Sequence, residues 1–189
     1  MSKVIDYKIL FQSQPVPTLV LQPDDPHFTI IDANPAFLHA TNSSPSDLFG
    51  KSLFAAFPEN PSEREANSIS NYYHYLQQVL STGRAHSLPV MRYDMLVRGT
   101  GAFEEKHWKP VYTPVLSQEG AVLYILVQVE DLTHAVKAGQ LLGEKEVELR
   151  QAHNFLKNAE ADAGFGTWVL DLENDRLSWS DGVFRLLGY

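Results

Sequence analysis

Three segments with the alternation and β-branched content of strands lie between Ser87 and Glu130, and they follow one another closely. They cover 87–97, 103–116 and 121–130, and the third is apolar on both faces over much of its length, as a central strand would be. The turn 117–120 joins the last two as a hairpin. These segments predict an antiparallel sheet as the framework of this part of the chain.

The preceding residues predict two shorter strands and several helices. Strands at 18–21 and 28–32 form a hairpin around the breaker-rich turn 23–26. Asn34 caps a helix that has Pro35 in its first turn, and short helical turns fill 44–57. The longest helix covers 62–81, with Ser62 and Glu65 at capping-box spacing. Two strands, then helices, then three strands indicate an α+β domain with one antiparallel sheet.

A long helix follows over 134–163, with apolar residues seven apart. Leu142, Leu149 and Leu156 form a coiled-coil-like seam. Alanines occupy most of the intermediate positions, and Lys145 interrupts them. One interpretation is a parallel homodimer contact through these leucines. The other is an amphipathic helix that packs back against its own domain.

The last segment, 164–189, begins again with strand patterns. Short strands at 167–170 and 177–179 precede a helix at 181–187, and this order resembles the start of the chain. We therefore expect a weak internal repeat whose second copy is truncated. The predicted division is 1–133, a globular domain; 134–163, a linker helix; and 164–189, the partial repeat.

Composition excludes several kinds of site. The chain has 15 Lys+Arg against 23 Asp+Glu, a net charge of −8, which argues against nucleic-acid binding. It has no Cys, so disulfides, thiolate metal sites and cysteinyl flavin adducts are excluded. The apolar stretch 121–127 is far shorter than a membrane span, and the N-terminus does not have the pattern of a signal peptide. We expect a cytoplasmic protein, or the cytoplasmic part of a longer one.

Several short motifs then occur in a fixed order. They are 32–37 (DANPAF), 49–51 (FGK), 57–61 (FPENP), 82–84 (TGR), 92–94 (RYD), 103–111 (FEEKHWKPV) and 130–133 (EDLT). Together they resemble a PAS domain of the subtype found in bacterial sensor histidine kinases, and the tail resembles the start of a second PAS domain. The resemblance implies a five-stranded antiparallel sheet in the order 2-1-5-4-3, flanked by helices. It also implies an input or dimerisation module placed before a kinase, a cyclase or a transcriptional output.

A pocket is expected between the helix 62–81 and the inner face of the sheet. The candidate lining residues are Tyr73, Leu76, Leu80, Val90, Tyr93, Tyr112, Leu126 and Gln128. These side chains form either an ordinary filled core or a small-molecule cavity. A ligand would be apolar or aromatic, with one or two polar anchors. Trp108 is expected to pack in the core or to lie at a partner surface.

No cofactor or metal is predicted. A haem could hang from His74, but this side chain points about 100° away from the apolar face of its helix. Flavin held without an adduct is equally disfavoured. The seven His show no i, i+4 pair of the kind that binds zinc.

Asp131 and Thr133 are the predicted signal-transfer residues, because they lie where the last strand meets the linker helix and can cap it. No catalytic motif is present, so the chain is not expected to be an enzyme itself. The sequence predicts a sensory PAS module of a two-component protein, with a kinase domain in the same parent chain. The alternative is a ligand-free interaction module that feeds another output.

Overall fold

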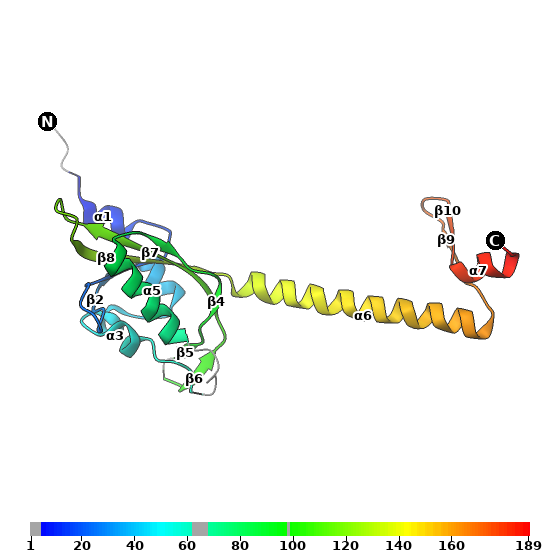
Figure 1. The fold of residues 1–189 in the computed structure, drawn as a ribbon, viewed down its shortest axis with the longest axis horizontal. Coiled ribbons are helices and arrows are strands. Elements are labelled where there is room, and N and C mark those ends of the chain that lie inside the picture. Colours follow the sequence, from blue (N-terminus) through cyan, green and yellow to red (C-terminus); the bar gives the residue numbers. More distant parts are fainter. Residues whose placement is uncertain (1–4, 62–67, 98) are drawn as a thin grey trace. The chain divides into compact units, whose positions relative to one another are not determined.

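A computed structural model describes residues 5–61, 68–97 and 99–189. The chain divides into two compact units, Met1–Val136 and Lys137–Tyr189. The first unit contains a 6-stranded antiparallel sheet in the order β2-β1-β8-β7-β3, with β4 also paired to β7 (Figure 1). The strands of this sheet are β1 Thr18–Leu21, β2 Ile30–Ala33, β3 His86–Ser87, β4 Met91–Arg92, β7 His107–Leu116 and β8 Val122–Asp131.

The predicted α+β class is confirmed, and the sheet has the expected order except in the detail of its third and fourth strands. Instead of one strand over 87–97, the chain forms β3, β4 and a separate strand, β5 Met95–Val97. The predicted strand 103–116 also divides, into β6 Ala102–Glu104 and β7. Within the described residues, β5 and β6 pair with each other in a two-stranded sheet of their own.

Two prolines lie where the third strand is interrupted: Pro89 between β3 and β4, and Pro110 on the partner strand β7. The Pro110 carbonyl accepts a hydrogen bond from the Leu88 amide at 2.9 Å, but proline has no N–H to return. Pairing therefore stops after Ser87, which lies opposite Val111, and resumes at Met91, opposite Trp108, with one extra residue on the β3–β4 side. This is a bulge next to a strand proline, one of the arrangements in which a sheet accommodates proline.

All helices of this unit but the first contribute residues to the core that covers the sheet. The helices are α1 Tyr7–Gln12, α2 Pro35–Ala40, α3 Pro45–Leu48, α4 Leu53–Ala56 and α5 Ser68–Thr82. Figure 1 shows α5 running across the sheet, and its Leu76 and Val79 are fully buried in the same core cluster as Leu19 of β1 and Ile125 of β8. The predicted capping box of Ser62 and Glu65 lies outside the described residues.

The second unit has a hairpin of β9 Trp168–Asp171 and β10 Arg176–Trp179, followed by α7 Asp181–Leu187. A 31-residue helix, α6 Thr133–Ala163, begins in the first unit and continues into the second. Near its end, the Glu160 carboxylate accepts hydrogen bonds from the Thr167 amide at 3.1 Å and from the Thr167 hydroxyl at 2.7 Å. The predicted domain boundaries and the partial repeat stay predictions.

None of the helices in the described ranges combines the length and the apolar character that crossing a bilayer requires.

Candidate functional site

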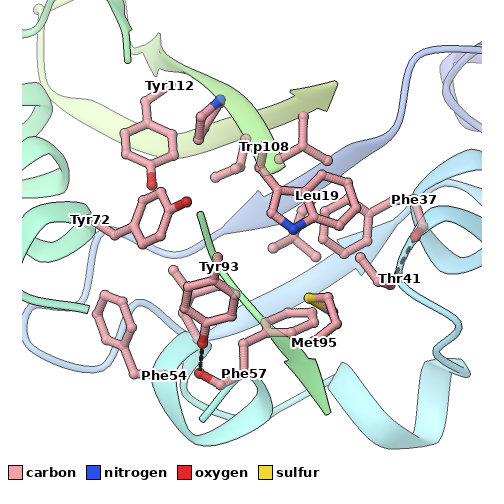
Figure 2. A pocket seen from close by; sticks show the side chains of 14 residues that line it. Leu19, Phe37, Thr41, Phe54, Phe57, Tyr72, Tyr93, Met95, Trp108 and Tyr112 are labelled. Atoms are coloured by element: carbon pink, nitrogen blue, oxygen red, sulfur yellow. Dashed lines mark hydrogen bonds between the residues drawn. The ribbon is translucent and has the colours of Figure 1, made fainter. Parts of the chain in front are cut away.

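A cavity of about 90 Å³ lies between the helices and the inner face of the sheet (Figure 2). The lining comes from helices and strands on both sides of the core and from the segments between them. The lining residues are Leu19, Phe37, Thr41, Leu53, Phe54, Phe57, Tyr72, Tyr93, Met95, Trp108, Pro110, Tyr112, Val127 and Val129. Aromatic and aliphatic side chains dominate this set, so the cavity is an apolar one with a few polar atoms on its wall.

Two of these polar atoms are occupied by neighbouring backbone. The Tyr93 hydroxyl donates a short hydrogen bond to the Phe57 carbonyl, and the Thr41 hydroxyl donates to the Phe37 carbonyl at 2.9 Å (Figure 2). Burial raises the pKa of the Tyr93 phenol and, in the same way, that of Tyr72 and Tyr112. All three hydroxyls are therefore uncharged at neutral pH, and the described residues place no Asp, Glu, Lys or Arg on the cavity wall.

Next to the cavity, an ion pair between the partly exposed Arg92 and the buried Asp94 flanks Tyr93. Asp94 is 8% exposed, and its carboxylate accepts from Arg92 Nε and from Asn60 Nδ2, both at 2.8 Å. The hydrogen bond from Arg92 holds the pKa of Asp94 below its ordinary value, against an opposing effect of burial. The charge of the Asp94 carboxylate, close to the cavity, is thus already paired with Arg92.

The corner between β8 and α6 is closed by a compact set of hydrogen bonds. Thr133, which is 5% exposed, donates from its hydroxyl to the Asp131 carboxylate and accepts from the His107 amide at 2.9 Å. The Thr133 amide donates to the same carboxylate at 2.9 Å, and the Leu132 amide donates to the His107 carbonyl at 2.8 Å. Both backbone polar groups of His107 therefore bond to the corner, and the strand passes directly into the helix.

Asp131 is held in its charged form at this corner. Partial burial would raise the pKa of its carboxyl, but hydrogen bonds from Thr133 and the positive charge of Lys106, whose Nζ lies 3.4 Å from Oδ2, lower the pKa below its ordinary value. Because α6 begins at Thr133, Asp131 stands one residue before the N-cap position. Its carboxylate accepts from the amide two residues later, at Thr133, and so forms a local turn. It does not occupy the N-cap position that the sequence predicts.

A family model described as the PAS fold matches residues 11–137. This chain belongs to the PAS family. The PAS match extends from α1 to the first residues of α6, so it includes both the cavity and the corner. No curated protein matches the sequence.

Solved structures show the same PAS fold at low sequence identity. A LOV protein from Rhodobacter sphaeroides is 19% identical, with a TM-score of 0.52 over 72% of this chain and 77% of that one. The PAS domain of the fruit-fly ELK potassium channel is 16% identical, with a TM-score of 0.51 over 68% of this chain and 95% of that one. A variant of RsLOV is 20% identical at a TM-score of 0.52, and the match spans 66% of this chain but only 64% of the length of that one.

The structure brings only part of the predicted pocket set to the PAS cavity. Tyr93 and Tyr112 line it. Leu76 is fully buried in the core, and Leu80 packs against the core, but neither lines the cavity. The Tyr73 hydroxyl donates to Asp25 at 2.6 Å on the exposed side.

Leu126 and Gln128 lie on the wrong side of β8 for the pocket. Val127 and Val129 line the cavity, and alternate residues of a strand point to opposite faces. Because β8 is apolar on both faces, its sequence does not show which face is the inner one. The prediction for Val90 is also wrong, since this residue is 43% exposed between β3 and β4.

Sequence reasoning missed several lining residues of the PAS cavity. Tyr72 lies on the apolar face that the spacing of apolar residues predicts for α5. The same face includes Tyr73, so the pattern does not show which of the two tyrosines lines the cavity. Phe37 and Phe57 come from short helical segments whose packing no periodicity reveals. Trp108, which is 5% exposed, takes the core position rather than a partner surface.

The structure gives no metal cluster within its described ranges, where no three His, Asp or Glu side chains converge. His74 Nε2 lies 2.9 Å from Gln78 Nε2 on the exposed side of α5 and is not among the residues that line the cavity. That the domain binds neither haem nor flavin stays a prediction, and an absorption spectrum of the purified protein tests it.

Proposed function

We propose that this chain is a sensory input module in which the PAS cavity is coupled to α6 through the Asp131–Thr133 corner. The observation that carries the proposal is the buried Thr133 hydroxyl, which joins the His107 amide of β7 to the Asp131 carboxylate of β8. A change at the start of β7 therefore acts directly on the first turn of α6.

The path from cavity to corner is one residue long. Trp108 lines the cavity, and His107, its neighbour on β7, bonds to Leu132 and Thr133 through its backbone. A shift of the Trp108 ring moves the strand that holds both hydrogen bonds. Losing one hydrogen bond of this kind costs about 1 kcal/mol, which is comparable to the bias that shifts a two-state helix equilibrium.

We further propose that α6 forms a parallel homodimer. Leu142, Leu149 and Leu156 are 71%, 71% and 58% exposed, which supports a seam that a second copy would cover. Packing of this face against its own domain is the alternative.

The resemblance of the motifs supports a bacterial two-component histidine kinase as the parent protein, with a cytoplasmic location. This predicts that the reading frame after Tyr189 encodes a phosphoacceptor His and a nucleotide-binding domain. The alternative, a ligand-free interaction module, predicts a cyclase or transcriptional output there.

A cavity-filling variant tests the coupling. Val129→Phe introduces a ring at the lining of the cavity and is expected to change hydrogen exchange of the amides in the first two turns of α6. In the Thr133→Ala background the change should become clearly smaller, because the His107 amide loses its hydroxyl acceptor and only the bond from the Leu132 amide to the His107 carbonyl still joins β7 to the corner. Thr133→Ser keeps the hydroxyl and should retain the response.

Thermal unfolding of each variant shows whether it is folded. If Val129→Phe does not fold, Leu53→Phe provides a second variant that fills the cavity. Identical α6 exchange with and without filling, while Thr133 is intact, contradicts the coupling. An α6 response of undiminished size in Thr133→Ala would show that the Thr133 hydroxyl does not carry the coupling.

A further inference from the structure

The Trp108 side chain is the unusual group on the cavity wall. Its Nε1 is buried and has no hydrogen-bond partner among the residues that the structure describes. An indole N–H can only donate, and buried polar groups in native proteins are nearly always paired. Figure 2 shows the ring among the lining side chains, with its nitrogen on the side of Met95.

We propose that the PAS cavity binds a neutral molecule about the size of one ring, apolar except for one hydrogen-bond acceptor, and that Trp108 Nε1–H donates to this acceptor. This binding site would be the input of the proposed sensory function. Only the effect of binding on α6 rests on that proposed function. The binding site itself is defined by the cavity and by Trp108.

The size of the cavity limits the ligand. A cavity of about 150 Å³ holds benzene in a well-studied engineered protein, and this one measures about 90 Å³. Met95 lines it, and the long thioether side chain adapts readily to a guest. The cavity is smaller than that benzene site, so a single small ring is the upper limit and enters only if side chains such as Met95 move aside.

The electrostatics of the wall exclude charged ligands. The lining, as far as the structure describes it, has no charged side chain, and its phenols remain protonated because burial raises their pKa. A carboxylate or an ammonium group would lose its hydration there without a counter-charge. One neutral acceptor, by contrast, gains a donor that the described residues leave unused.

Pyridine and benzene test the proposal, because they have the same shape and differ by one acceptor nitrogen. Both are titrated into the full chain at mildly alkaline pH, where pyridine is neutral, and followed through the indole N–H resonances by heteronuclear NMR. Both should bind, and pyridine should move the Trp108 N–H signal downfield, as expected for a hydrogen bond. In Trp108→Phe the ratio of dissociation constants, benzene over pyridine, should fall about fivefold.

Trp168→Phe is the matched control, since Trp168 is 64% exposed and lies outside the PAS domain. Together with Trp179→Phe it also assigns the Trp108 signal, so the wild-type titration decides the matter if Trp108→Phe does not fold. Absence of binding by both probes overturns the proposal, and so does binding of both without a specific shift of the Trp108 signal. Neither result depends on α6, whose coupling is tested separately by Val129→Phe and Thr133→Ala.

Discussion

At the scale of single residues, Asn34 shows how one side chain can organise several segments. It is fully buried, and its Oδ1 accepts from the amides of Thr18 and Phe37, both at 2.9 Å. Its Nδ2 donates to the Val16 carbonyl at 2.8 Å and to the Gln14 carbonyl at 3.2 Å. The predicted cap of α2 is confirmed, and the same side chain also fixes the chain leading into β1.

Replacing Asn34 tests this role. Asn34→Ala removes the side-chain acceptor of the buried Thr18 amide and one of the two acceptors of the Phe37 amide, so the free energy of unfolding should fall by about 2 kcal/mol. Asn34→Asp keeps the acceptor for the amides of Thr18 and Phe37 but loses the two bonds that Nδ2 donates. Below neutral pH its free energy of unfolding should lie between those of the wild type and Asn34→Ala. Urea denaturation measures both, and a loss in Asn34→Ala no larger than about 0.5 kcal/mol would contradict the assignment.

Asp131 makes the stability of the corner depend on pH. Its folded pKa lies below the ordinary value of 3.8, because bonds from Thr133 and the charge of Lys106 outweigh the opposing effect of burial. The stabilisation is therefore complete above the unfolded pKa and is lost as pH falls through the folded one. Asp131→Asn should be less stable than wild type at neutral pH, and the difference should shrink below about pH 4 in urea titrations. A difference that stays constant into strong acid would contradict this.

At the scale of elements, α6 exposes its leucine seam on a chain that lacks cysteine. Single cysteines therefore report on the proposed dimer without background. Leu149→Cys stands in the seam and should form an intermolecular disulfide quickly under mild oxidation, because parallel seam positions bring equivalent residues close together. Asn154→Cys, on the opposite side of the helix, is the control and should react slowly. Equal rates at the two sites would contradict a dimer through this face.

At the scale of the whole molecule, the core belongs entirely to the PAS domain. All residues of the buried hydrophobic cluster lie between Leu19 and Val127. The stability of the domain should therefore come from residues that precede α6. The remaining segment, 137–189, forms a separate compact unit.

Truncation after Val136 tests this division. The shortened chain should unfold cooperatively, with a free energy of unfolding within about 0.5 kcal/mol of the value for the PAS domain in the full chain. The fluorescence of Trp108, which is 5% exposed, should report the transition in both proteins. A truncation before Val122 removes β8 from the centre of the sheet and should not fold. A clear loss of stability in the first truncation would show that residues 137–189 contribute to the domain.

Local signals carried most of the fold. The sequence by itself determined the helix capped by Asn34, and its patterns indicated the strand 18–21 and the passage from strand to helix at 131–133. The bonds from His107 that close this corner come from a distant part of the chain. The α+β order and the PAS resemblance followed from the succession of such elements.

Tertiary structure alone decided the rest, because the deciding partners are far apart in sequence. Pro110 interrupts a strand that lies well before it in the chain, by withholding a donor across the sheet. The sequence of β8 does not show that Val127, and not Leu126, faces the cavity. Both faces of this strand are apolar, so pairing with its neighbours decides which face is the inner one. The helices and the sheet together bury Trp108 Nε1 and leave it without a partner among the described residues. No sequence pattern shows which buried donor will be unpaired.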